Sequence, residues 1–180
     1  MKRHTQAVAL CGVLGALAVA VMLLGAVLPI ALYIAPMFAG LLVLVVREEC
    51  GTRMAWTMYA AVSLLGVLFV PDKEVVFTFI FIAGYYPLVK PRLDALCPLV
   101  LRLSAKLLLF NGSVLVMYGI LMLLFFPSWM QMQWNMAELL FTGVILLLGN
   151  AAFFLYDKAV VNLLRAYRLL WQPRLHRMLR

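Results

Sequence analysis

The sequence predicts an all-α membrane protein, with six transmembrane helices in a compact bundle and both termini cytoplasmic. First, 67% of the 180 residues are hydrophobic and only 12% are charged, whereas a soluble domain is nearer half apolar and a quarter charged. Second, short polar segments divide the chain into six apolar runs. Third, six spans would place fourteen of the 15 Lys and Arg residues on the same side of the membrane. The positive-inside rule makes that side the cytoplasmic one. Lipid must therefore face most of the surface.

The first predicted span, residues 7–28, follows a short basic start and is long enough to cross the hydrocarbon core. Small residues recur along it at steps of three and four, which places them on one helical face: Ala9, Gly12, Ala16 and Ala20. Small residues let helices approach closely in lipid. We therefore expect this face to pack against another helix, and both a helix of the same chain and a separate subunit remain open.

The next three spans are predicted at residues 30–46, 54–70 and 75–89. Pro29 ends the first span. If Pro36 interrupts the second, its broken backbone must be buried in protein or line a cavity, because lipid cannot satisfy free peptide groups. The fourth span lies near the lower length limit for crossing a bilayer.

The second half of the chain begins with an amphipathic interfacial segment, residues 90–106, which Pro98 divides into two pieces. Spans five and six are predicted at residues 107–126 and 138–156, and residues 157–180 form a basic, amphipathic cytoplasmic tail. These segments complete a transmembrane domain at residues 1–156.

Two asparagines, Asn111 and Asn150, lie at similar depth in the last two spans. We expect an interhelical hydrogen bond between them, worth on the order of 1 kcal/mol. Coordination of a substrate is the alternative interpretation.

Aromatic and charged side chains gather in the three outer loops and the adjoining span ends. A small aromatic, charge-bearing ligand could be held there by stacking and ion pairing, and a rim that contacts lipid headgroups needs the same residue types. The predicted ligand-binding residues are Tyr33, Asp72, Lys73, Glu74, Trp129, Trp134 and Glu138.

Several classes of protein are not expected. The sequence contains no HExxH, GxSxG or Walker A motif, so we predict no enzyme and no ATPase. The three cysteines lack paired spacing and the two histidines lie in the tails, so we expect no metal site and no cofactor. The net charge is +8, and the basic residues that produce it flank apolar spans. This position indicates topogenic charge and contact with membrane lipid rather than a nucleic-acid partner.

Over nearly its whole length the chain resembles the substrate-binding S components of energy-coupling factor (ECF) transporters. The resemblance rests on the six-span plan and on the sequence ALCGVLGALAVA after the basic KRH start, with Ala9, Gly12, Ala16 and Ala20. It implies that these four residues dock on a transmembrane coupling subunit, which acts with ATPase subunits to import a small vitamin-like or metabolite ligand across a bacterial cell membrane. The alternative function is a non-transport scaffold or assembly protein, whose cytoplasmic segments bind lipid or another protein.

Overall fold

The computed structural model describes residues 2–28, 31–125, 136–167 and 169, without the side chains of residues 2–4 and 137–139. Every regular element in these residues is a helix, which confirms the all-helical prediction. Four helical segments in the described part are long and apolar enough to cross a membrane: Thr5–Val27, Thr52–Phe69, Leu99–Phe125 and Leu140–Ala166. The chain is therefore a membrane-embedded helical protein.

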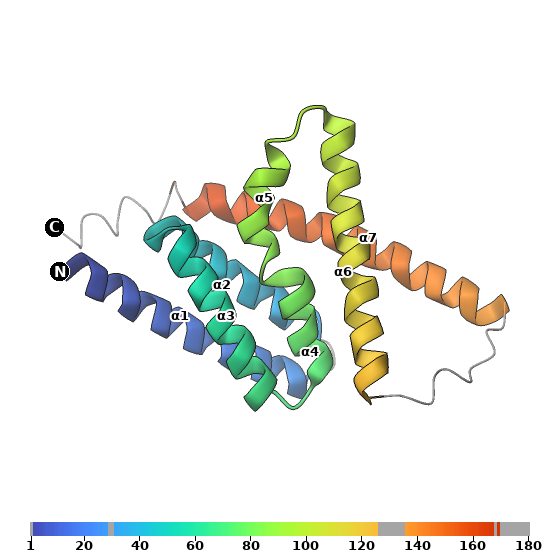
Figure 1. Cartoon of the computed structure of the whole chain (residues 1–180), viewed down its shortest axis with the longest axis horizontal. Coiled ribbons are helices and arrows are strands. Elements are labelled where there is room, and N and C mark those ends of the chain that lie inside the picture. Colours follow the sequence, from blue (N-terminus) through green and yellow to red (C-terminus); the bar gives the residue numbers. More distant parts are fainter. Residues whose placement is uncertain (1, 29–30, 126–135, 168, 170–180) are drawn as a thin grey trace.

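Three antiparallel helices lie side by side in the first half of the chain: α1 (Lys2–Val27), α2 (Ile34–Cys50) and α3 (Thr52–Phe69) (Figure 1). Pro36 lies in the first turn of α2, where its missing N–H would have no helical partner, so α2 is not interrupted. Gly51 alone joins α2 to α3. Its φ of 86° lies in the left-handed region that glycine adopts without strain.

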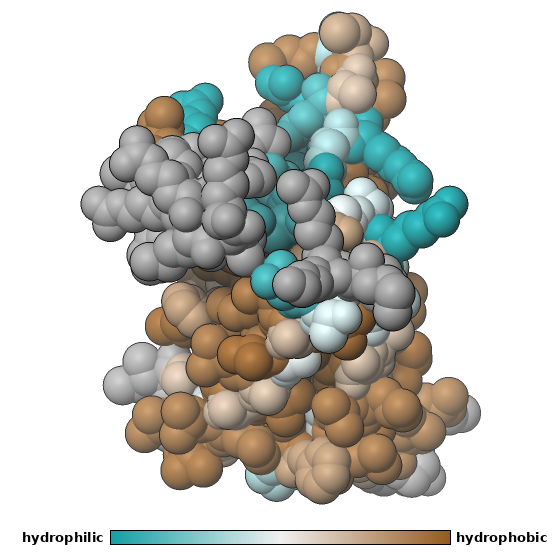
Figure 2. All heavy atoms as spheres, turned by 90° about the vertical axis from the view of Figure 1, so that its left-hand side faces the viewer, coloured by the Kyte–Doolittle hydropathy of each residue, from teal (hydrophilic) through white to brown (hydrophobic). Residues whose placement is uncertain are grey.

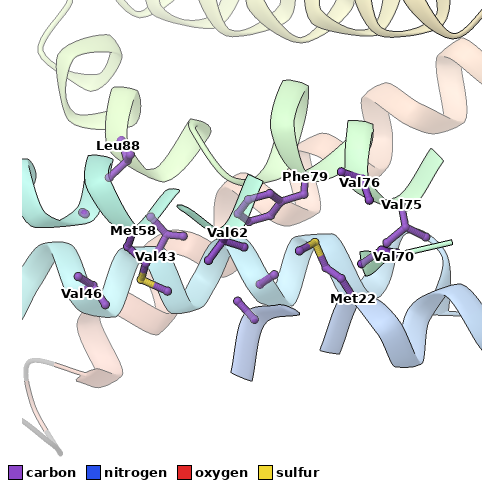
Figure 3. Packing of buried hydrophobic residues seen from close by; sticks show 13 residues of the cluster. Met22, Val43, Val46, Met58, Val62, Val70, Val75, Val76, Phe79 and Leu88 are labelled. Carbon is purple, nitrogen blue, oxygen red and sulfur yellow. The ribbon is translucent and has the colours of Figure 1, made fainter. Parts of the chain in front are cut away.

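The core of this half is built from small and aliphatic side chains on facing helices. Ala18 and Met22 of α1 are fully buried and pack in one cluster with Val43 of α2 and Val62 of α3. Figure 3 shows Met22 in this cluster together with Val76 and Phe79, which belong to the segment after α3. Close packing of this kind supplies the dispersion energy that holds helices together in lipid.

The fourth predicted span is a composite of three helical pieces, α4 (Lys73–Thr78), the π-helix η2 (Phe79–Ala83) and α5 (Tyr86–Asp94). Together they cover 22 residues from the first bound to the last, or roughly 33 Å at 1.5 Å per residue. The segment is therefore longer than the predicted span of residues 75–89 and projects beyond it at both ends.

Tyrosines from neighbouring helices donate hydrogen bonds to two backbone carbonyls of the π-helix. Tyr59 of α3 donates to the Ile80 carbonyl at 2.8 Å, and Tyr156 donates to the Ala83 carbonyl at 2.9 Å. Gly40 of α2 lies against Ala83 so closely that a Cβ atom there would collide with its carbonyl. The irregular backbone is thus covered by protein, as a membrane interior requires.

The last two helices of the described residues are α6 (Leu99–Phe125) and α7 (Met136–Ala166). Figure 1 shows α6 at a steep angle to α1–α3, with α7 crossing behind it. Both extend past the predicted spans: α6 begins just after Pro98, and α7 continues ten residues into the predicted tail.

The segment of residues 90–106, predicted to be amphipathic, begins and ends at a buried lysine. Lys90 and Lys106 are buried, whereas Val100 is 75% and Leu103 46% exposed. The two ammonium groups turn inward because carboxylates on α5 and α7 neutralise them there.

Large apolar side chains remain exposed on α6 and α7. Leu108, Leu123, Leu140 and Leu147 are each at least 70% exposed. Figure 2 shows hydrophobic side chains covering most of the lower half of one face, with hydrophilic side chains gathered above them. Lipid is the solvent that such an apolar surface requires.

Candidate functional site

A carboxylate that accepts two phenol hydrogen bonds forms the centre of the first candidate site. Tyr33, just before α2, and Tyr118 of α6 each donate to Oε1 of Glu74 at 2.8 Å. Hydrogen bonds to a charged acceptor are stronger than neutral ones. The structure thus brings together two of the predicted ligand-binding residues, Tyr33 and Glu74, and adds Tyr118. We call these three residues the Glu74 cluster.

The neighbours of Glu74 hold the loop in shape. Asp72 caps α4, since its Oδ1 accepts from the Glu74 backbone N–H at 2.9 Å. The Lys73 ammonium donates to the carbonyls of Val67 at 2.9 Å and Val70 at 3.0 Å, and so satisfies the last turn of α3. Asp72 and Lys73 therefore lie beside the Glu74 cluster, with their polar atoms engaged by the backbone.

Three further predicted ligand-binding residues lie beyond what the structure describes. Trp129 and Trp134 fall outside the described residues, and Glu138 belongs to α7 but its side chain is not described. The predicted site is therefore characterised only at Tyr33, Asp72, Lys73 and Glu74.

The predicted docking residues of α1 all lie on an exposed face. Ala9, Gly12, Ala16 and Ala20 are exposed, and a Cβ atom at Gly12 would meet no heavy atom within 4 Å. At 3.6 residues per turn this face lies opposite the buried Ala18. Within the chain, α1 packs through other small residues, including Gly15, whose Cβ position lies 3.6 Å from Val62. The described part of the chain therefore leaves the four predicted residues uncovered.

A second polar site, which we call the Asp157 network, joins α5, α6 and α7. The Lys106 ammonium contacts Oδ2 of Asp157 at 3.0 Å and Oδ1 of Asp94 at 2.6 Å. Lys90 also binds Asp157, lies 3.4 Å from Asp94, and shares Asp157 with the Tyr86 hydroxyl. Two lysines and two aspartates therefore neutralise one another where three helices meet.

Burial makes this network electrostatically strong. The side chains of both lysines are 7% exposed and that of Asp157 is 17% exposed. Desolvation acts to raise the pKa of the Asp94 carboxyl, but the ammonium groups of Lys106 and Lys90 outweigh it, so the pKa lies below its ordinary value of 3.8. The ion pairs of the network tie the three helices together.

Aromatic rings support the network from the apolar side. Phe153 of α7 stacks on Phe110 of α6 with centroids 4.7 Å apart and meets the Tyr86 ring edge-to-face at 4.8 Å. Such pairs add to the burial energy of their area. Tyr86 therefore connects the charged network to the aromatic core.

The two asparagines form a reciprocal pair between α6 and α7. Each amide nitrogen donates to the other side-chain oxygen at 3.1 Å, so the predicted interhelical hydrogen bond between Asn111 and Asn150 is confirmed. The remaining N–H groups donate to the carbonyls of Leu107 and Leu146, four residues earlier. This pairing gives both amides a structural role.

A groove lies next to the Asp157 network, between α2, α5 and α7. Its cavity is about 440 Å³, and four of its lining residues carry charge: Arg47, Glu48, Lys90 and Asp94. The sequence does not reveal this groove or the inward-facing lysines, because a hydropathy pattern shows only that charges flank a span. No group of three or more His, Cys, Asp or Glu side chains in the described residues could hold a metal ion.

The fold and these sites define a membrane-embedded, all-helical protein with a polar cluster on Glu74 and a buried ion-pair network on Asp157. Comparison with protein-family models, with curated proteins and with solved structures found no match to the chain.

Proposed function

We propose that the chain is the substrate-capture subunit of an ATP-driven importer, similar to the S component of an ECF transporter. In this proposal both termini are cytoplasmic and six segments span the bilayer. The spans are α1, α2, α3, the composite α4–η2–α5, α6 and α7. The arrangement of α1 and α7 supports this topology, because α1 begins and α7 ends on the same side of the molecule (Figure 1).

The observation that carries the proposal is the uncovered small-residue face of α1. A protein that packed this face within its own bundle would bury it, yet Ala9, Gly12, Ala16 and Ala20 are exposed while Gly15 and Ala18 pack inward. Small residues on a lipid-facing surface let a second helix approach closely, and dispersion and backbone contacts then stabilise the pair. A transmembrane coupling subunit is the partner that this proposal assigns to the face.

The ligand in this proposal binds at the outer side, at the Glu74 cluster. One carboxylate oxygen already accepts from Tyr33 and Tyr118, so a ligand that displaces a phenol or adds a donor would gain a charge-assisted hydrogen bond. A small vitamin-like or metabolite ligand with a donor group fits this chemistry. ATPase subunits would supply the energy for release inside.

The docking claim is tested by a matched pair of substitutions in α1. Ala16→Leu adds bulk to the small-residue face and should abolish co-purification with a coupling subunit in mild detergent. Leu17→Phe is the control and should leave co-purification unchanged. It adds bulk at the next residue, whose side chain is 45% exposed and lies about 100° around the helix from Ala16. If the complex survives Ala16→Leu, the docking face is wrong.

The topology is tested separately by labelling with a membrane-impermeant thiol reagent. A cysteine at Lys73 should react from outside intact cells, and one at Arg92 should react only after permeabilisation. The reverse pattern would overturn the orientation. A chain that co-purifies only with unrelated proteins and carries no ligand would instead be a scaffold or assembly protein.

A further inference from the structure

We propose that the groove between α2, α5 and α7 is a binding site for a membrane phospholipid whose headgroup carries both a phosphate and a primary ammonium group. Phosphatidylethanolamine is the common lipid of this chemistry. The site is separate from the Glu74 cluster and from the small-residue face of α1, and the inference does not depend on the transport proposal.

The groove lies where apolar helices end. Arg47 and Glu48 directly follow the apolar run of α2, and Lys90 and Asp94 lie in the last turns of α5. The apolar wall includes Leu44 of α2 and Val161 and Leu164 of α7. A hydrogen bond of 2.7 Å from Tyr167 to Glu49 ties the end of α7 to α2, so both walls are held in place. Such a site meets a headgroup and the first methylenes of an acyl chain together.

The charges of the groove favour a zwitterion over an anionic lipid. Arg47 and Lys90 contribute two positive charges, and Glu48 and Asp94 contribute two negative charges, so the formal sum is zero. An anionic headgroup would bring its phosphate near two carboxylates with no cation of its own to pair with them. A zwitterionic headgroup can match both signs at once, and electrostatic complementarity of this kind determines specificity.

Arg47 is the principal phosphate ligand in this proposal. One of its terminal nitrogens donates to the Pro87 carbonyl at 3.1 Å, which positions the side chain at the groove. A guanidinium group has five N–H donors in a planar fork, so donors remain that match two phosphate oxygens. Lys90 is held by Asp94 and Asp157 and contributes mainly its charge.

The lining also favours a primary ammonium over a quaternary one. Quaternary ammonium groups are recognised by aromatic cages, and none of the residues that line the groove is aromatic. A primary ammonium has three N–H donors, and the carboxylates of Glu48 and Asp94, with about four acceptor sites each, can accept them beside their partners within the chain. Phosphatidylethanolamine should therefore bind better than phosphatidylcholine with the same acyl chains.

The test is native mass spectrometry of the delipidated full-length chain in detergent. The protein is mixed with equal amounts of dioleoyl phosphatidylethanolamine, phosphatidylglycerol and phosphatidylcholine. We expect about tenfold more retained phosphatidylethanolamine than either competitor, the effect of roughly one charge-assisted hydrogen bond. Equal retention of the three lipids, or a preference for either competitor, would overturn the proposal.

Two variants and one control place the effect at the groove. Val161→Trp fills the groove and should remove the preference, while Val144→Trp, at a 57% exposed position on the same helix, should retain it. Glu48→Lys changes the lining sum from zero to +2 and should switch the preference to phosphatidylglycerol. A preference that survives Val161→Trp, or that does not switch in Glu48→Lys, contradicts the assignment.

Discussion

The Asp157 network gives the sharpest stability prediction. Asp157 accepts from Lys90, Lys106 and Tyr86, and both lysine side chains are 7% exposed. Asp157→Asn keeps the shape of the side chain and removes its charge. The two buried ammonium groups are then left to share Asp94, whose side chain is 36% exposed.

The expected loss follows from this burial. Removing one partner of a buried ion pair costs about 3–5 kcal/mol, because the remaining charge stays desolvated and uncompensated. For a chain of this size, each kcal/mol corresponds to roughly 2–4 °C in melting temperature. Asp157→Asn should therefore lower the melting temperature in detergent by about 10 °C, measured by the thermal shift of intrinsic fluorescence.

Two controls separate the network from a general effect of the substitution. Asp72→Asn makes the same chemical change at the cap of α4, where an asparagine caps about as well, and should shift the melting temperature by less than about 2 °C. Adding Lys106→Met to Asp157→Asn removes one unpaired charge and should recover part of the loss. A loss under about 1 kcal/mol for Asp157→Asn, the size of an exposed pair, would refute the reasoning.

Three further predictions concern packing, backbone satisfaction and pH. Gly40→Ala should destabilise the protein in thermal melts by about 1–3 kcal/mol, because the Cβ of the new alanine would collide with the Ala83 carbonyl. Gly112→Ala is the control and should be neutral or stabilising, because the Cβ position there has open space around it. Tyr156→Phe leaves the Ala83 carbonyl without its 2.9 Å donor and should cost about 1–3 kcal/mol in the same assay, and an unchanged melting temperature would contradict this role. The depressed pKa of Asp94 predicts stability that is present above pH 3.8 and lost as the pH falls through the folded-state value; the difference in melting temperature between wild type and Asp94→Asn should shrink from pH 5 to pH 3, and a constant difference would count against it.

The sequence predicted those features that depend on local pattern. Apolar runs predicted the helices, and their charge-free lengths identified α1, α3, α6 and α7 as long enough to cross a membrane. Similar depth along two spans predicted the Asn111–Asn150 pair. These features follow from composition and helical geometry, which do not require knowledge of how the helices pack.

Features that depend on packing could not be predicted. No sequence pattern shows that Asp157 lies against Lys90 and Lys106 after α7 folds back. In the sequence Tyr118 is one tyrosine within an apolar span. It donates a hydrogen bond to Glu74 only because of the way α6 packs in the fold. Gly40 and Tyr156 both lie against the Ala83 carbonyl of the π-helix, a contact that a hydropathy profile cannot reveal.

The most direct test of the proposed capture function is affinity purification of the wild-type chain from its native membrane in mild detergent, with mass spectrometry of both proteins and small molecules. We predict recovery of a transmembrane coupling subunit, ATPase subunits and a bound small molecule that is lost in Glu74→Gln. Recovery of unrelated membrane proteins without ATPases or ligand would contradict the account and assign the chain to the scaffold class.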